Sequence, residues 1–218
     1  MTVEQLVDEL KEDGVITAPE VYQAFLNVDR ADFVLPEFKL QSYINAPLPI
    51  GYGQTISQPQ TVAFMLELLA VKPGQKVLDI GAGSGWQTAL LSYLVSHDET
   101  GKELPANVTG RVIGLEILPE LTRLALKNIG QYSFVSKKIT EVHCRNAISG
   151  YPKEAPFDRI IAAAASRQIP AAWFEQLKPG GRLVAPIENK IILYLKDETG
   201  NLSEKVFNGF SFVPFVGE

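Results

Sequence analysis

Cysteine and histidine are scarce in this chain of 218 residues, which has one cysteine, Cys144, and two histidines. A single cysteine excludes an internal disulfide bond, and we therefore expect a cytoplasmic protein. One cysteine and two histidines also cannot supply the ligand set of a typical His/Cys zinc site, so we expect no metal. The chemistry of this chain must come from other side chains.

Long hydrophobic runs and an excess of positive charge are also missing. No segment approaches the roughly 18 unbroken apolar residues of a membrane helix, and residues 1–10 lack the basic and apolar regions of a signal peptide. The formal net charge is −5, from 25 acidic and 20 basic side chains. This balance disfavours a broad phosphate-binding surface. We therefore expect neither a membrane nor a nucleic acid as a partner.

Hydrophobic residues make up 46% of the chain, which is enough to bury a sizeable core in one structural domain. Apolar side chains at helical spacing predict a helix over residues 3–12. A second helix is predicted from about 18 to 28, because Thr17 and Glu20 have the spacing of a capping box. Prolines and glycines interrupt residues 36–59, which predicts an extended linker or binding loop there.

From residue 76 onward, short apolar strands alternate with helices. This alternation predicts an α/β fold with a doubly wound, mostly parallel sheet. The last two β-rich runs are separated by Asp197-Glu198-Thr199-Gly200-Asn201, which predicts a hairpin and therefore antiparallel strands at the end of the sheet. The predicted strands span 77–80, 111–116, 139–143, 159–163, 182–186, 191–195 and 206–213, and the predicted helices span 86–95 and 119–128, with a further one opened by Pro170.

A glycine-rich turn follows the first of these strands. Gly81, Gly83 and Gly85 form a G-x-G-x-G pattern, in which glycines let a ligand approach the backbone closely. The dinucleotide fingerprint has its third glycine one place later, where this chain has Trp86, so a nicotinamide cofactor is disfavoured. The pattern is typical of S-adenosylmethionine binding, with Glu116 at the end of the next strand placed to hold the ribose hydroxyls. A tight turn without a ligand is the alternative.

The most specific segment lies in the proline-rich region, where residues 47–59 read PLPIGYGQTISQP. Supporting matches follow in unbroken order along nearly the whole chain, at residues 77–86, 113–121, 156–161, 178–183 and 212–214. Together these motifs resemble the protein-L-isoaspartate (D-aspartate) O-methyltransferase family.

The resemblance implies a fold of the class I S-adenosylmethionine-dependent methyltransferase type. This is an α/β fold with a doubly wound, mostly parallel sheet, antiparallel C-terminal strands and a small N-terminal helical subdomain. Residues 1–59 would form the N-terminal helices and the active-site loop, packed on a Rossmann-like core of residues 60–218 within one structural domain.

The implied activity is methyl transfer from S-adenosyl-L-methionine to the α-carboxylate of L-isoaspartyl residues in damaged proteins and peptides. The transfer leaves S-adenosyl-L-homocysteine, and the methyl ester then collapses to a succinimide, which begins the repair. Isoaspartyl proteins and peptides are therefore the expected partners, no metal is involved, and we expect a monomer.

The resemblance also implies roles for individual residues of this sequence. Ser57 matches the active-site serine of the family, which orients the reacting carboxylate. The expected substrate contacts are Ile50, Ser57, Val213 and Pro214. The expected cofactor contacts are Thr55, Ile56, Asp79, Gly81, Ala82, Gly83, Gly85, Glu116, Ile117, Asn146 and Ala147.

Ser57 also has a structural interpretation, because Ser57-x-x-Gln60 has the spacing of a capping box for a helix over residues 60–69. Two positions depart from the family pattern. Asn45 stands where an aspartate is common, and Asn146 replaces an acidic residue that meets the adenine amino group, keeping an acceptor oxygen without the charge. Two alternatives therefore stay open: a diverged methyltransferase for another peptide carboxylate or a small molecule, and an S-adenosylmethionine-binding module without turnover.

The remaining candidate residues are expected to be structural. His143 and Cys144 adjoin at a strand end, where successive side chains point to opposite faces, so no catalytic pair is expected. Trp86 and Trp173 are expected in the core, and Asp158 in a turn at the start of a strand.

Overall fold

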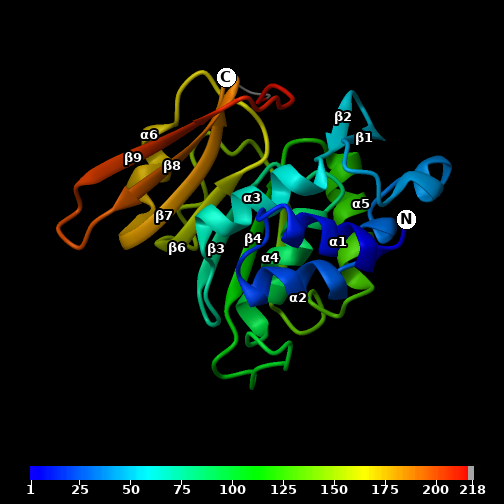
Figure 1. Ribbon diagram of the computed structural model, residues 1–218. Coiled ribbons are helices and arrows are strands. Elements are labelled where there is room, and N and C mark those ends of the chain that lie inside the picture. Colours follow the sequence, from blue (N-terminus) through cyan, green and yellow to red (C-terminus); the bar gives the residue numbers. More distant parts are fainter. Residues whose placement is uncertain (216–218) are drawn as a thin grey trace.

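The chain folds around one long sheet of seven strands (Figure 1). In this computed structural model, which describes residues 1–215, the strands are β3 (Lys76–Ile80), β4 (Arg111–Glu116), β5 (Thr140–Cys144), β6 (Phe157–Ala162), β7 (Leu177–Ile187), β8 (Lys190–Lys196) and β9 (Leu202–Asn208). Their order across the sheet is β5-β4-β3-β6-β7-β8-β9. Strands β3 to β7 are parallel, whereas β8 and β9 are antiparallel to their neighbours. The predicted sheet is therefore confirmed.

Helices cover both faces of this sheet. They are α1 (Val3–Glu12), α2 (Pro19–Asn27), α3 (Pro59–Leu69), α4 (Trp86–Ser96), α5 (Pro119–Gly130) and α6 (Ala171–Glu175), with the 3-10 helices η1 (Arg30–Asp32) and η2 (Pro36–Gln41). Successive residues of β3 point to opposite faces. Val77 therefore packs in a core with α3, α4 and α5, whereas Leu78 and Ile80 pack in a second core with Trp173 of α6.

The start of α2 differs from the predicted capping box. Ala18 is the N-cap residue and makes no side-chain capping bond. Instead, Glu67 of α3 accepts hydrogen bonds from the N–H groups of Thr17 and Ala18 at 3.0 and 2.9 Å, and from the Thr17 hydroxyl at 2.6 Å. Glu20 forms an ion pair with Lys72 at 2.9 Å. The prediction was wrong because a carboxylate distant in sequence takes the place of the local one.

The segment between α2 and α3 contains the loop predicted from its prolines and glycines. Strands β1 (Leu48–Gly51) and β2 (Gln54–Ile56) pair there as a two-stranded hairpin, separate from the long sheet. Its tip is formed by Gly51, Tyr52 and Gly53, which all have positive φ. Two glycines at this tip relieve the strain that side chains would cause. In Figure 1 the hairpin and the segment after β9 both lie at the upper end of the molecule.

The last strand ends earlier than predicted. The sequence predicts a strand over 206–213, but β9 ends at Asn208 and Gly209 follows with a φ of 93°. Beyond this turn the chain leaves β8 and pairs elsewhere: the carbonyl of Val213 accepts the Ala165 N–H at 2.9 Å. Because Ala165 lies just after the end of β6, residues 209–215 cross the carboxyl end of the sheet.

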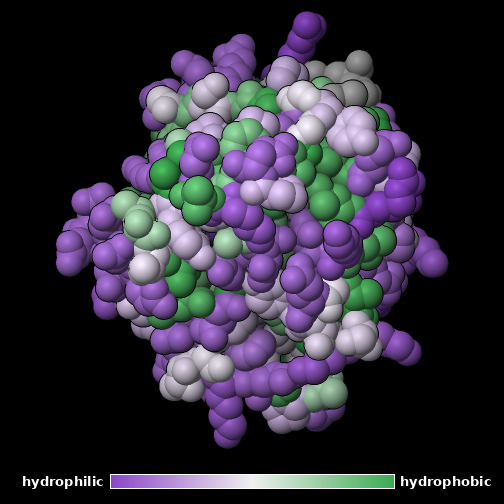
Figure 2. Space-filling view, turned by 90° about the vertical axis from the view of Figure 1, so that its right-hand side faces the viewer, coloured by the Kyte–Doolittle hydropathy of each residue, from purple (hydrophilic) through white to green (hydrophobic). Residues whose placement is uncertain are grey.

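Figure 2 shows the side of the molecule on which the N-terminal helices and the β1–β2 hairpin lie in Figure 1. Hydrophilic residues cover most of this face, and hydrophobic residues lie in small groups among them. Within residues 1–215, no helix is both long enough and apolar enough to cross a membrane.

Candidate active site

The glycine loop is a tight turn between β3 and α4. Gly81, Gly83 and Gly85 have φ values of 84°, 56° and 95°, in the left-handed region that residues with a side chain rarely adopt. A Cβ atom at Gly85 would also lie 3.0 Å from the side chain of Ile129 in α5. The glycines therefore permit both the turn and the close packing of α4 against α5.

Glu116, the last residue of β4, holds this loop from the neighbouring strand. One carboxylate oxygen accepts a hydrogen bond from the N–H of Gly83 at 2.9 Å, and the other accepts one from the N–H of Leu118 at 3.0 Å. The residue is only 7% exposed, and these charge-assisted bonds stabilise its carboxylate there. Each oxygen has a second lone pair that can accept a hydrogen bond from a ligand.

Asp79 lies beneath the loop and is fully buried. Its carboxylate accepts hydrogen bonds from the Gln87 amide at 2.7 Å and from the Thr88 hydroxyl at 2.6 Å, both in α4. Burial raises the pKa of Asp79 to about 6, because desolvation penalises the charged form. Asp79 therefore joins β3 to α4 directly under the turn.

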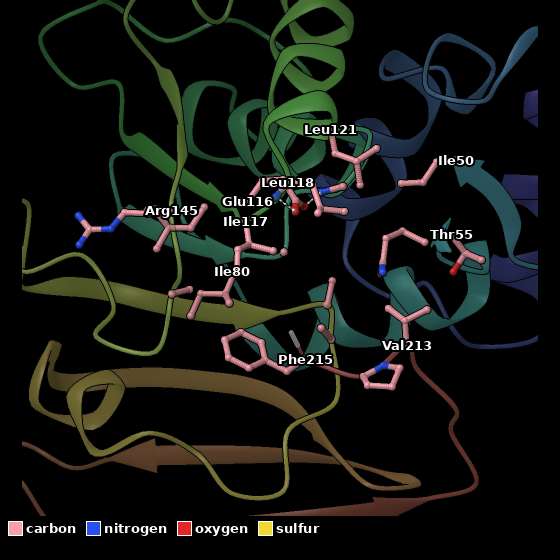
Figure 3. A pocket seen from close by; sticks show the side chains of 18 residues that line it. Ile50, Thr55, Ile80, Glu116, Ile117, Leu118, Leu121, Arg145, Val213 and Phe215 are labelled. Carbon is pink, nitrogen blue, oxygen red and sulfur yellow. Dashed lines mark hydrogen bonds between the residues drawn. The ribbon is translucent and has the colours of Figure 1, made fainter. Parts of the chain in front are cut away.

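A cleft opens at the carboxyl ends of β3, β4 and β6 (Figure 3). Its empty space, with the open mouth included, is about 590 Å³. In Figure 3, Glu116 lies near the centre beside Ile117 and Leu118, while Thr55 and Val213 face the cleft from the N-terminal and C-terminal parts of the chain. Of the predicted site residues, the cleft brings together Ile50, Thr55, Gly81, Gly83, Glu116, Ile117, Ala147, Val213 and Pro214.

A second, wider groove adjoins this cleft and contains Ser57. The described residues that line the groove carry no charged side chain. Thr55, Ala163, Val213 and Pro214 line both the groove and the cleft. The two spaces therefore meet at these four residues, which form a shared border.

Ser57 does not cap the helix that follows it, so the structural interpretation of Ser57-x-x-Gln60 is wrong. Helix α3 begins at Pro59 with Gln58 as N-cap residue and has no side-chain cap from its own segment. Asn45 acts from the preceding loop: its Oδ1 accepts the Gln60 N–H at 3.1 Å, and its Nδ2 donates to the Gln60 side chain at 2.8 Å. The half-buried Ser57 hydroxyl has no hydrogen-bond partner within residues 1–215.

Five of the expected cofactor residues do not line the cleft. Asp79 lies beneath the loop, Ile56 and Ala82 are buried, and Gly85 is the N-cap residue of α4. Asn146 is exposed, and its side-chain oxygen accepts a backbone N–H two residues further on at 2.9 Å. Direct contact of these five with a cofactor stays a prediction.

The sequence interpretation missed nine residues that line the cleft. They are Gln54, Ile80, Leu115, Leu118, Leu121, Arg145, Ala163, Ala164 and Phe215. Ile80, Leu115 and Ala163 lie at the carboxyl ends of parallel strands. The rule that ligands bind outside these strand ends could have found all three. Phe215 reaches the cleft because the chain turns at Gly209, and the dipeptide Asn208-Gly209 is a local turn signal that could have ended the predicted strand there.

The residues expected to be structural are confirmed as such. Trp86 and Trp173 are buried, and each donates its indole N–H to a backbone carbonyl. Asp158 accepts hydrogen bonds from the N–H of Lys76 at 2.7 Å and from the ammonium group of Lys178 at 2.8 Å. These contacts hold the ends of neighbouring strands together.

His143 and Cys144 form no catalytic pair. His143 Nε2 lies 3.1 Å from the Glu141 carboxylate and 3.2 Å from the Tyr151 hydroxyl. Cys144 Sγ lies 3.7 Å from the carbonyl oxygen of Ile117. Over the part of the chain that the structure describes, no group of three or more His, Cys, Asp or Glu side chains is arranged to hold a metal ion.

A protein-family model described as Protein-L-isoaspartate(D-aspartate) O-methyltransferase matches residues 1–218. The chain belongs to this family. The resemblance found in the sequence is therefore confirmed over residues 1–218 of this methyltransferase.

Relatives and solved structures agree with the family match. The chain is 40% identical to a protein-L-isoaspartate O-methyltransferase of Methanopyrus kandleri, over 99% of this chain and 91% of the relative. It is 41% identical to one of Thermococcus onnurineus, over 97% and 92%. A Plasmodium falciparum protein assigned to the same family, crystallised with S-adenosyl-L-homocysteine, superposes with a TM-score of 0.83 at 25% identity, over 99% of this chain and 98% of the other.

The raised pKa of Asp79 gives the methyltransferase a specific dependence of stability on pH. The unfolded chain has the ordinary value of 3.8 and the folded protein a value of about 6. The contribution of this group to the free energy of unfolding is therefore highest below pH 4, falls as pH rises to about 6, and stays low above it. Asp79→Asn removes the titration, and its oxygen and NH₂ group can still bond to Gln87 and Thr88.

We expect the stability of Asp79→Asn relative to the parent protein to rise between pH 4 and pH 7 by on the order of 2–3 kcal/mol. Urea unfolding of both proteins at a series of pH values measures this difference. Other titrating groups are common to both proteins and cancel. A difference that stays constant over this pH range would contradict the prediction.

Proposed function

We propose that this chain transfers a methyl group from S-adenosylmethionine to the α-carboxylate of L-isoaspartyl residues in proteins and peptides, and so starts their repair through a succinimide. The observation that carries this function is the shared border between the cleft of the glycine loop and the groove of Ser57. A methyl donor in the first space and an acceptor in the second would meet there. Membership of the family over the whole chain supports this choice of donor and acceptor.

The residues of the cleft fit S-adenosylmethionine. When bound, it supplies a methyl group on a sulfonium, which is an activated electrophile. Glu116 has free lone pairs for the ribose hydroxyls, and Gly81 and Gly83 let the backbone approach closely. A Cβ atom at Gly83 would lie 3.3 Å from the side chain of Ile50 in β1, so Ile50 packs closely over the loop and leaves little room for a side chain at position 83. The S-adenosyl-L-homocysteine in the P. falciparum relative agrees with this assignment.

The groove suits a carboxylate acceptor because no charged side chain lines it among the described residues. A carboxylate with a pKa near ~4 is already anionic at neutral pH, so no general base is needed. Its charge is neutralised as the methyl group arrives. A cation beside it would stabilise the reactants more than the transition state. Placement of the oxygen in line with the methyl group then supplies most of the acceleration.

Ser57 is the residue that we assign to orient the acceptor carboxylate. Its hydroxyl is half-buried in the groove, and all of its hydrogen-bonding capacity is available within residues 1–215. Thr55, Val213 and Pro214 form the border between the two spaces, and Ile50 faces the cleft. An uncharged hydroxyl can donate to the carboxylate without holding its negative charge as strongly as a cation would.

We further propose the setting in which the enzyme works. It acts as a monomer in the cytoplasm on isoaspartyl proteins and peptides, without a nucleic acid or membrane partner. The single cysteine suits a reducing compartment, and the net charge of −5 disfavours nucleic acid. Residues 1–59 position the active-site loop on a core of residues 60–218 within one structural domain.

The function is tested with two peptides that differ only in L-aspartate versus L-isoaspartate at one position. We expect methyl transfer from radiolabelled S-adenosylmethionine to the isoaspartyl peptide and none above background to the aspartyl peptide. Because the isoaspartyl residue presents its α-carboxylate on a side branch of the chain, only this peptide offers the expected acceptor. Equal labelling of both peptides would favour a diverged carboxyl methyltransferase, and labelling of neither would contradict the proposal.

Glu116 is expected to contribute strongly to cofactor affinity. A buried carboxylate would accept hydrogen bonds from two ribose hydroxyls. Its removal should lower the binding free energy of the cofactor by about 1.5–3 kcal/mol. Glu116→Ala should therefore raise the Kd for S-adenosylmethionine roughly ten- to hundredfold, measured by calorimetric titration. Glu120→Ala, which removes an exposed carboxylate ion-paired with Arg123 in α5, is the matched control. If the two variants bound S-adenosylmethionine with equal affinity, Glu116 would not contribute to cofactor binding.

Ser57→Ala should separate activity from stability. The hydroxyl makes no bond within residues 1–215, so the free energy of unfolding should change by less than about 0.5 kcal/mol. The rate of methyl transfer at saturating cofactor should fall by at least roughly tenfold, which corresponds to one lost hydrogen bond of about 1.4 kcal/mol.

Ser57→Thr is the matched control because it keeps a hydroxyl, and it should retain more activity than Ser57→Ala. Cofactor affinity is measured in parallel and should stay unchanged in both variants. A folded Ser57→Ala protein that methylates the isoaspartyl peptide at the parent rate would show that Ser57 does not orient the acceptor.

A further inference from the structure

Arg30 is a charged side chain in an unusual place, since it is 1% exposed and forms no ion pair with the described residues. It lies in η1, between the N-terminal helices and the loop that leads to Ser57. Burying a guanidinium group without a carboxylate is costly unless its N–H groups are hydrogen-bonded. The contacts that it makes therefore show what it holds together.

The guanidinium group donates to four backbone carbonyl oxygens. One terminal nitrogen donates to Ser42 at 2.7 Å and to Ile44 at 3.3 Å, and the other donates to Ala46 at 2.9 Å and to Ser57 at 3.1 Å. Three of these carbonyl oxygens belong to the loop before β1. The fourth belongs to Ser57, the residue that we assign to orient the substrate carboxylate. Arg30 therefore fixes the backbone of Ser57 to a loop 11 or more residues before it.

The same guanidinium group also lies against the start of the glycine-loop helix. Its carbon atom is 5.4 Å from the centre of the Trp86 ring, and Trp86 is the first residue of α4, directly after Gly85. The Trp86 indole donates to the carbonyl of Val28 at 3.2 Å, which is two residues before Arg30. Arg30 is thus packed between the element that carries the cofactor loop and the backbone that carries Ser57.

From this arrangement we propose that Arg30 is a positioning residue for methyl transfer, which sets the place of the Ser57 hydroxyl relative to the cofactor loop. It touches neither ligand and acts through the Ser57 backbone. The proposal rests on the proposed function, because it assumes that Ser57 orients the acceptor. It matters for rate because a misplacement of about 1 Å at a reacting group can lower a rate by about 10²-fold.

Lysine cannot replace arginine in this role. Its ammonium group is a single compact charge, whereas the planar guanidinium group spreads its donors over a fixed fork that reaches four separated carbonyls. Arg30→Lys should therefore lower the kcat for the isoaspartyl peptide by at least roughly tenfold. The Kd for S-adenosylmethionine should change by less than about twofold, because Arg30 does not line the cleft.

Arg159→Lys is the matched control for loss of a buried guanidinium group. Arg159 is 9% exposed and donates to the carbonyl of Ala70 at the far end of α3. This variant should lose stability but keep kcat within about twofold of the parent. Arg30→Gln is made in parallel with Arg30→Lys, because removing the charge also removes its desolvation cost and favours a folded variant. All rates are measured with saturating cofactor at a temperature where circular dichroism shows each variant to be folded.

A double-mutant cycle between Arg30 and Ser57 decides whether Arg30 acts through Ser57. If it does, Arg30→Lys combined with Ser57→Ala should be no slower than Ser57→Ala alone, to within about twofold. Multiplying rate losses would mean that Arg30 affects the rate independently of the Ser57 hydroxyl, and this result or a parent kcat in both Arg30 variants would overturn the proposal. Failure of the parent protein to methylate the isoaspartyl peptide would instead contradict the proposed function.

Discussion

Burial of both faces of the parallel sheet is the constraint on which the site depends. Helices α3, α4 and α5 cover one face and α6 covers the other, so a ligand can reach the strands only at an edge where they end. The turns after β3, β4 and β6 all leave the sheet at the same edge. Gly81, Glu116 and Ala163 therefore lie around one cleft although they are far apart in the sequence. The packing of the sheet, more than any single motif, decides where chemistry is possible.

Long-range polar contacts then bring the N-terminal segment to that edge. Glu67 holds the start of α2, Asn45 holds the start of α3, and Arg30 holds the backbone of Ser57. Glu67 and Asn45 take the place of the two local capping boxes that the sequence predicted. The serine hydroxyl is left without a structural partner within residues 1–215. These contacts also explain why asparagine suits position 45. An aspartate there would still accept the Gln60 N–H but could not donate a hydrogen bond to the Gln60 side chain.

The sequence predicted those features that depend on local periodicity. Apolar runs marked β3 to β6 and β8 to within two residues, whereas β7 begins five residues before the strand predicted over 182–186. The glycine loop was found from its spacing alone. The capping boxes at Thr17 and Ser57 were wrong because the helix starts that they describe are bonded to Glu67 and Asn45, which are distant in sequence. The strand predicted over 206–213 was too long, since Gly209 turns the chain away and its backbone pairs with Ala165 instead. The contacts of Glu67, Asn45 and Ala165 exist only in the folded chain, whereas the turn at Asn208-Gly209 has a local signal that the sequence interpretation did not use.

The cleft is built from both ends of the chain, and this gives the order of biosynthesis a consequence. Ile50 and Thr55 form one wall early in translation, whereas Val213 and Phe215 form another only after every strand has been made. A nascent or truncated chain that stops after β9 would have the sheet, the glycine loop and Ser57, yet its cleft would lack a wall. The cleft for the methyl donor would thus be complete only after residues 209–215 have crossed the carboxyl end of the sheet.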